Sequence, residues 1–292
     1  MDDIRPLLDL LDLEPLEVNI YRGQNRDLGS GRVFGGQVFA QALVAARRTV
    51  DAPRECHSAH GYFILPGDLQ APIVYFVDRL RDGGSFTTRR VTAIQHGQAI
   101  FNLSASFHVE EPGPSHQAPM PDVPPPEDLA PELQLIREMA DRIPEPLRTV
   151  LTQDRPIDIR PVRPTDPFKP APPSEPVRHL WFRAISALPD ERLIHQAVLA
   201  YASDYGLITT SLLPHGLSYR ARGLQMASLD HSLWMHRPFR VDDWLLYAMD
   251  SPSAAGARGF ARGSIFTRSG ELVASVAQEG LLRLRPPVPE HP

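Results

Sequence analysis

The sequence of 292 residues contains a single cysteine, Cys56. One cysteine excludes an internal disulfide framework and any metal site built from several cysteines. We expect it to be a small buried residue rather than a catalytic thiol. The sequence also lacks an apolar run of the ~20 residues needed to cross a bilayer. Its N-terminus lacks the basic-then-apolar layout of a secretory signal. We therefore expect a cytoplasmic protein without stable membrane insertion.

Basic residues are not in excess. The 30 Lys and Arg are outnumbered by 35 Asp and Glu, which gives a formal net charge of −5. Because a nucleic-acid-binding surface needs a basic footprint, this composition argues against a nucleic-acid partner. Apolar residues make up 42% and charged residues 22% of the chain, as in soluble globular proteins. The length is sufficient for two modest domains.

Several catalytic motifs are missing. The sequence contains no G-x-S-x-G nucleophile elbow, no H-E-x-x-H zinc motif and no phosphate-binding G-x-x-x-x-G-K loop. It has no dinucleotide-binding fingerprint either. If the protein is an enzyme, we expect it to work without a metal or a redox cofactor.

Prolines are concentrated in the middle of the chain, where 18 of the 31 lie between Pro112 and Pro176. Proline fixes φ and removes a backbone donor. Residues 111–178 are therefore predicted to be an extended connector that forms no regular sheet, with a short helix near 133–142. The connector separates two folded units, residues 1–110 and 179–292.

The two units share one organisation, a helix of small and apolar residues followed by three strand-like runs. The helices are expected at 35–49 and 194–209, and the runs at 73–80, 85–95, 98–109, 244–250, 257–267 and 271–284. A helix that is apolar on most sides is buried. Turn signals between the runs indicate antiparallel meanders. The sequence therefore predicts an α+β fold in which a meander wraps a helix, twice over.

A shift of 173 positions relates the two meanders. It places Gly97 on Gly270 and Arg89 on Arg262. The evidence for duplication lies in these matched turns and patterns, because identical residues are sparse.

Polar residues of the second unit replace small or apolar ones of the first. Asp204 ends an apolar stretch, Ser228 lies in a strand-like segment, and Gln278 interrupts an apolar strand where the first unit has Ala105. Burying a carboxylate or an amide without a partner is costly. Asp204 is therefore open to two interpretations: a carboxylate at a solvent-facing helix edge, or a general base aimed into a cleft.

The histidines carry a weaker signal. His231 and His236 are five residues apart, so they would face opposite sides of a strand. We interpret their segment mainly as structural core with a polar edge, and treat His57 in the first unit with the same caution.

Seven short sequence motifs follow one another along the chain. They are VFGGQV (33–38), HGYFILPGD (60–68), LRDGGSF (80–86), YASD (201–204), LDHSLW (229–234), HRPF (236–239) and ASVAQEG (274–280). This set, within a stretch from about Glu17 to Arg283, resembles the type II acyl-CoA thioesterases, the TesB-like family.

The resemblance implies a double hotdog, two fused units that each wrap a helix in antiparallel strands. It also implies hydrolysis of acyl-CoA to free fatty acid and CoA, without a cofactor. In this family an Asp, a Thr and a Gln hold and activate the attacking water, and they correspond to Asp204, Ser228 and Gln278 in the C-terminal unit. Serine keeps the hydroxyl but loses the methyl group that restricts the rotamer. His57 matches a histidine considered in this family and ranks below these three.

The resemblance further implies an apolar channel for the acyl chain and basic residues at its mouth for the CoA phosphates. Arg258 and Arg262 are candidates for the latter. A homodimer or homotetramer is expected. Two alternatives stay open: a hotdog hydratase or dehydratase, in which Asp204 and His231 would form the acid–base pair, and a non-catalytic acyl-CoA-binding module.

Overall fold

The computed structural model describes residues 3–29, 31–169 and 171–285. The first half contains two helices and six strands among the described residues. They are α1 (Arg5–Leu11), β1 (Glu14–Glu17), β2 (Ile20–Gly23), α2 (Gly35–Arg47), β3 (Glu55–Phe63), β4 (Ile73–Asp82), β5 (Phe86–Gln95) and β6 (Gln98–His108). As predicted, α2 is buried along almost its whole length.

The connector contains short helices and one strand. They are η1 (Pro126–Asp128), α3 (Glu132–Glu138), η2 (Ala140–Arg142), α4 (Leu147–Leu151) and β7 (Ile157–Pro161). The prediction that residues 111–178 form no regular sheet is therefore wrong at β7. This strand lies at the edge of the sheet, where proline is tolerated because one side needs no hydrogen-bond donors.

The second half repeats the helix and the meander. Its elements are β8 (Val177–Ala184), α5 (Arg192–Ala202), η3 (Ile208–His215), β9 (Leu224–Ser228), β10 (Asp230–Met235), β11 (Leu245–Ala255), β12 (Arg258–Thr267) and β13 (Leu272–Leu284). The helix expected at 194–209 ends earlier than predicted and is followed by the separate turn η3.

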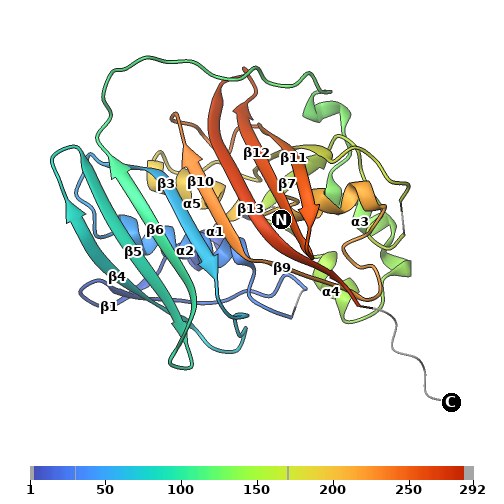
Figure 1. Cartoon of the computed structure of the whole chain (residues 1–292), viewed down its shortest axis with the longest axis horizontal. Helices are drawn as coiled ribbons and strands as arrows, with labels where there is room; N and C mark the ends of the chain where they lie inside the picture. Colours follow the sequence, from blue (N-terminus) through green and yellow to red (C-terminus); the bar gives the residue numbers. More distant parts are fainter. Residues whose placement is uncertain (1–2, 30, 170, 286–292) are drawn as a thin grey trace.

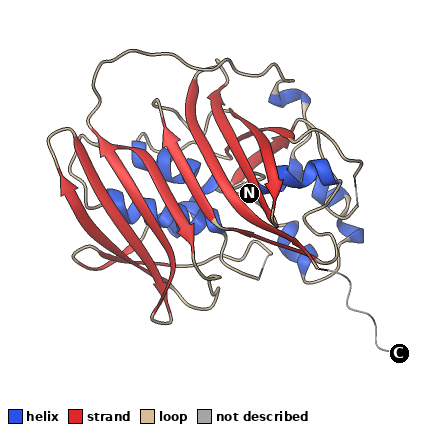
Figure 2. Cartoon of the chain, in the orientation of Figure 1, coloured by secondary structure: helices blue, strands red, loops and turns tan. Residues whose placement is uncertain are grey.

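The strands of both halves form one antiparallel sheet, with the helices on one side of it (Figure 1, Figure 2). β3 pairs with β10 at a central seam. From this seam outward, the order β3-β6-β5-β4-β2-β1 on one side corresponds to β10-β13-β12-β11-β8-β7 on the other. β9 is outside this path and pairs with the end of β13. The strand order therefore matches the predicted duplication.

The register of the two meanders corrects one predicted match. Arg90 pairs with Asp78 across β4 and β5, and Arg262 pairs with Asp250 across β11 and β12. Arg262 thus corresponds to Arg90, and its predicted match with Arg89 is wrong. Arg89 is fully buried, whereas Arg262 is exposed, since an offset of one residue moves a side chain to the other face of a strand.

In β6 and β13, which follow the hairpin turns, corresponding residues are again 173 positions apart. Gly97 and Gly270 lie in these turns with φ of 74° and 90°, a conformation that favours glycine. Ala105 lies opposite Arg89, and Gln278 lies opposite Ala261. Ala105 and Gln278 are therefore corresponding residues, and both are buried.

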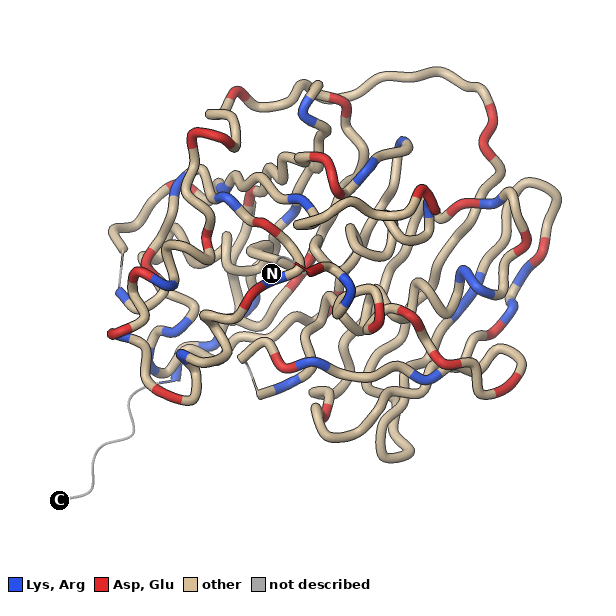
Figure 3. Tube along the Cα trace, turned by 180° about the vertical axis from the view of Figure 1, so that it is seen from behind, with Lys and Arg blue, Asp and Glu red and all other residues tan. Residues whose placement is uncertain are grey.

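One hydrophobic core runs through both halves, and α2 and α5 pack together within it. The predicted boundaries at residues 110 and 178 stay an interpretation, because the two units share this core and one sheet. The connector crosses from β6 to the far side of the molecule (Figure 1). In the described residues no helix is both long and apolar enough to cross a membrane. Basic and acidic residues are interspersed along the trace (Figure 3).

Candidate active site

Asp204 follows α5 at the point where α2 begins. Its Oδ2 accepts a hydrogen bond of 2.9 Å from the backbone N–H of Gly36. Its Oδ1 accepts one of 2.7 Å from Nε2 of Gln278. A helix N-terminus carries partial positive charge, which stabilises a carboxylate placed there. Asp204 is half-buried, with a donor on each oxygen, and does not stand free at a helix edge.

Two glycines permit this approach of α2 to α5. A Cβ on Gly36 would lie 2.4 Å from the carbonyl oxygen of Tyr201, and a Cβ on Gly35 would lie 2.9 Å from Oδ2 of Asp204. Phe34, the N-cap residue of α2, stacks on Tyr205 with ring centroids 5.2 Å apart. The start of α2, from the first half, is therefore fitted against the end of α5, from the second.

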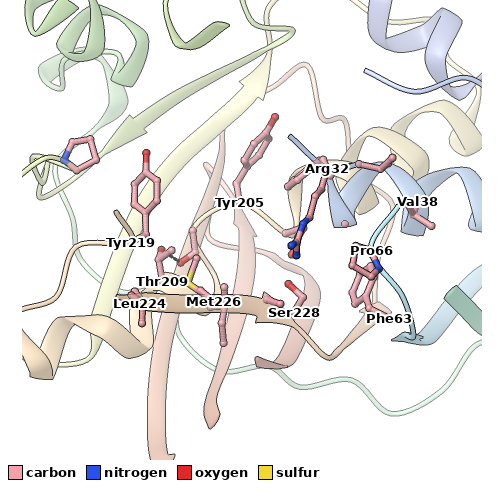
Figure 4. A pocket seen from close by; sticks show the side chains of 18 of the residues that line it. Arg32, Val38, Phe63, Pro66, Tyr205, Thr209, Tyr219, Leu224, Met226 and Ser228 are labelled. Atoms are coloured by element: carbon pink, nitrogen blue, oxygen red, sulfur yellow. Dashed lines mark hydrogen bonds between the residues drawn. The ribbon is translucent and has the colours of Figure 1, made fainter. Parts of the chain in front are cut away.

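Asp204 and Ser228 line one cavity of about 890 Å³. Figure 4 shows its wall, with Ser228 near Phe63 of the first half and Tyr219 at the other end. The connector also contributes to this wall. Its lining residues include Glu132, Leu135, Ile136, Met139 and Arg155. All three segments of the chain thus build the cavity.

Ser228 ends β9 and pairs with Gly280, two residues beyond Gln278 on β13. Its half-buried hydroxyl has no hydrogen-bond partner within the described ranges, so it is available to a bound water or ligand. The three predicted site residues therefore gather from separate elements. Asp204 and Gln278 are hydrogen-bonded, and Ser228 shares the cavity with Asp204.

His231 lies in the structural core, in agreement with the interpretation of its segment. It lies directly behind Gln278, whose Nε2 is 3.1 Å from Nδ1 of His231. The ring is 1% exposed, and burial lowers its pKa although the nearby Asp204 acts in the opposite direction. The spacing of the two histidines predicted opposite faces of the strand, but not which residues His231 would contact.

The other histidines lie away from the cavity. His57 Nε2 is 2.8 Å from the hydroxyl of Ser106, and His236 Nε2 is 2.8 Å from that of Ser275. Neither histidine lines the cavity. His231 is buried and His236 is exposed, which confirms that they face opposite sides.

The two arginines predicted to bind the CoA phosphates also lie away from the cavity. Arg258 pairs with Glu279 and Arg262 with Asp250, both on exposed positions outside the cavity. The arginines that do line it are Arg32, Arg155 and Arg178. Arg155 pairs with Glu132 at 2.7 Å.

Comparisons with known proteins agree with this arrangement. A family model described as acyl-CoA thioesterase matches residues 147–281, and one described as acyl-CoA thioesterase N-terminal domain matches residues 25–108. Acyl-CoA thioesterase 2 of Haemophilus influenzae is 42% identical over 283 residues, which cover 97% of this chain and 98% of that protein. The chain belongs to the acyl-CoA thioesterase family. The membership predicted from the motifs is thus confirmed.

Solved structures confirm the fold of this family member. Acyl-CoA thioesterase II TesB2 from Mycobacterium marinum is 45% identical, with a TM-score of 0.78, and the match covers 97% of this chain and 99% of that one. A protein with a hotdog fold from Alicyclobacillus acidocaldarius is 20% identical, with a TM-score of 0.76 over 95% and 98% of the two chains. The second likeness concerns the fold alone, and together they confirm the predicted double hotdog.

Proposed function

We propose that this protein hydrolyses fatty acyl-CoA to free fatty acid and CoA through a water molecule activated by Asp204 and oriented by Ser228 and Gln278. The observation that carries the proposal is the Asp204 carboxylate, which borders a large cavity while Gly36 and Gln278 hold both of its oxygens. Fixing a reactant in this way supplies much of the catalytic effect of an active site.

The residue types suit direct attack by water. Asp204 accepts a proton as the water oxygen bonds to the thioester carbon. When the C–S bond breaks, that proton passes from Asp204 to the leaving CoA sulfur, and the acyl group keeps the water oxygen as a carboxylic acid. Gln278 is fully buried and does not line the cavity, so in this proposal it orients the water through Asp204, whose Oδ1 it holds. The Ser228 hydroxyl, at the cavity wall, gives the water a second contact. No covalent intermediate is required.

The cavity suits both parts of an acyl-CoA. Its apolar lining, which includes Val38, Phe63 and Ile64, fits an acyl chain. Arg32 and Arg178 give it basic side chains for the anionic phosphates of CoA, which guanidinium groups bind well. The substrate class rests on this combination and on the family.

The burial of His231 weighs against the hydratase or dehydratase alternative. An acid–base pair must reach the substrate, whereas His231 is 1% exposed and lies behind Gln278. The binding-module alternative depends on Ser228 being inadequate for catalysis. Its hydroxyl is available at the cavity wall, which favours hydrolysis.

The test is release of CoA from palmitoyl-CoA, followed with a thiol reagent. Hydrolysis that Asp204→Ala and Gln278→Ala abolish supports the proposal. Hydration of an enoyl-CoA without CoA release would support the first alternative, and tight binding with neither reaction the second. The enzyme's own thiol does not disturb the assay, because burial raises the pKa of Cys56 to about 12.

We further propose that the enzyme is cytoplasmic and forms a homodimer or homotetramer. A single buried cysteine is compatible with a reducing compartment. The sheet has free edges at β1 and β7, where hotdog units can associate. Cell fractionation tests the location, and light scattering on the purified protein gives the number of subunits.

A further inference from the structure

We infer that His231 is a positioning residue, which acts by holding the amide of Gln278 in the orientation that the reaction requires. The inference rests on the proposed hydrolysis and adds a residue to it. His231 touches neither the cavity nor, by our proposal, the reacting atoms.

The hydrogen bonds of Gln278 define that orientation. Its Nε2 is 2.7 Å from Oδ1 of Asp204 and 3.1 Å from Nδ1 of His231. A carboxylate only accepts, so the atom facing Asp204 must be the amide nitrogen. One N–H goes to each acceptor, and Oε1 is left without a protein partner in the described residues. This orientation is the one that gives Oδ1 of Asp204 its donor.

The same bonds fix the proton on the histidine. Because Nδ1 accepts from Gln278, a neutral ring carries its hydrogen on Nε2. Nε2 is 2.8 Å from the hydroxyl oxygen of Ser203, and that hydroxyl in turn donates to the carbonyl of Ala200 at 2.8 Å. Every bond then runs in one direction: from His231 to Ser203, and from Ser203 to the end of α5.

Ser203 is itself held in place. Its N–H donates to the carbonyl of Leu199, and its carbonyl accepts from the buried hydroxyl of Tyr247 at 2.7 Å. The ring of His231 lies edge-on to Phe39, with centroids 4.7 Å apart. The imidazole therefore has little room to rotate, and Nδ1 stays directed at Gln278.

An amide turned by half a rotation would lose both contacts. Oε1 would then face Oδ1 of Asp204 and Nδ1 of His231, two acceptors. Without His231, only Asp204 opposes that rotation. Polar networks in a buried site favour the arrangement in which each donor meets an acceptor. The histidine thus adds a second penalty against the orientation that would leave Oδ1 of Asp204 without its donor.

Two variants of similar size separate positioning from simple packing. In His231→Asn, the side-chain oxygen takes the place of Nδ1 and still accepts from Gln278. In His231→Leu, no acceptor remains. We expect kcat on palmitoyl-CoA to fall about 100-fold in His231→Leu, the cost of a misplaced group, with KM changed by less than about threefold. His231→Asn should keep kcat within about fivefold of the unchanged protein, since one acceptor is retained. Equal losses in the two variants, or full activity in His231→Leu, would overturn the inference.

NMR of the unchanged protein labelled with ¹⁵N-histidine reports which ring nitrogen of His231 is protonated. Because this measurement needs no substitution, misfolding of a variant cannot affect it. A neutral ring protonated at Nε2 supports the inference, and a ring protonated at Nδ1 or at both nitrogens contradicts it. If the unchanged protein releases no CoA from any acyl-CoA while its ring is protonated at Nε2, the proposed hydrolysis fails but the contact with Gln278 is supported. The two failures can therefore be told apart.

Discussion

At the end of α5 the chain places a carboxylate beside a cavity, whereas at the corresponding end of α2 it places a threonine beside a buried guanidinium. Thr49 follows the C-cap residue of α2 as Asp204 follows that of α5. The strand positions nearby differ as well. Arg89 in the first half corresponds to Ala261 in the second, and Ala105 corresponds to Gln278.

The corresponding polar groups of the first half, Arg89 and Thr49, are bonded to each other. Arg89 is fully buried and donates from Nε to the hydroxyl of Thr49 at 2.8 Å and from Nη2 to its carbonyl at 2.9 Å. Further bonds go to Asp82 and to the carbonyl of Arg81. In the second half, Ser228 and Gln278 instead leave polar atoms without a protein partner in the described ranges. The comparison indicates one reactive site per chain.

The largest loss of activity is expected from a substitution at the start of α2, the part of the active site that comes from the first half. Gly36→Ala would bring a methyl group against the carbonyl of Tyr201, so α2 must shift away from Asp204. We expect kcat for CoA release to fall about 100-fold, the usual cost of a displacement near 1 Å. Gly84→Ala is the matched control, since nothing lies within 4 Å of its added methyl group. Comparable activity in both variants would show that the first half does not contribute to the site.

A second prediction compares the fully buried Arg89 with the half-buried Arg178. Arg89 is fully hydrogen-bonded, whereas Arg178 lines the cavity with a buried Nε that has no partner in the described residues. Burial lowers the pKa of Arg178, although Glu132 acts in the opposite direction. We expect Arg178→Gln to raise KM for acyl-CoA about tenfold, since a charge-assisted bond to phosphate is lost.

The control for Arg178 is a change of substrate. An S-acyl-pantetheine carries no adenosine phosphates, so its KM should be the same for the unchanged protein and for Arg178→Gln. A similar rise for both substrates would show that Arg178 does not contact phosphate.

A smaller effect is expected at Ser228. Ser228→Thr adds the methyl group that limits side-chain rotamers, so the hydroxyl should hold the water more firmly and raise kcat about two- to fivefold. Ser228→Val has nearly the same shape as threonine but no hydroxyl, and should lose at least about tenfold. Steady-state kinetics on one acyl-CoA decides, and equal activity of the Thr and Val variants would exclude a role for the hydroxyl.

The smallest effect on turnover is expected at Arg89. Arg89→Met leaves the Thr49 carbonyl without a donor, and should lower the free energy of unfolding by about 2–4 kcal/mol. We expect kcat to stay within about twofold, because the arginine belongs to the unreactive half. Denaturant unfolding and the CoA-release assay measure the two quantities. A large loss of kcat with unchanged stability would contradict the comparison.

Much of this arrangement could be predicted from the sequence, because it follows from local patterns. Asp204 and Gln278 interrupt apolar runs, and a buried polar side chain needs a partner. The buried helices and antiparallel meanders follow from periodicity and turn residues. The family resemblance then assigned roles that polarity alone left open.

The rest depends on contacts between distant segments. The sequence marks Gly36 as a helix start, but the meeting of its N–H with Asp204 depends on how α2 packs against α5. The place of His231 beside Gln278 is likewise tertiary. Arg89 was matched one residue out of register, an error that changes the face of a strand. Because the connector is rich in proline, its sequence did not indicate the edge strand β7 or its contribution to the cavity wall.

Fusion into a single polypeptide has an evolutionary consequence at the start of α2. α2 opens with two glycines, whereas α5 opens with Arg192 and Leu193. In an assembly of two identical subunits, every substitution is made twice, so both helix starts must keep the same residues. A covalently joined pair is free of that constraint. One copy can supply the helix start, while the other supplies the acid.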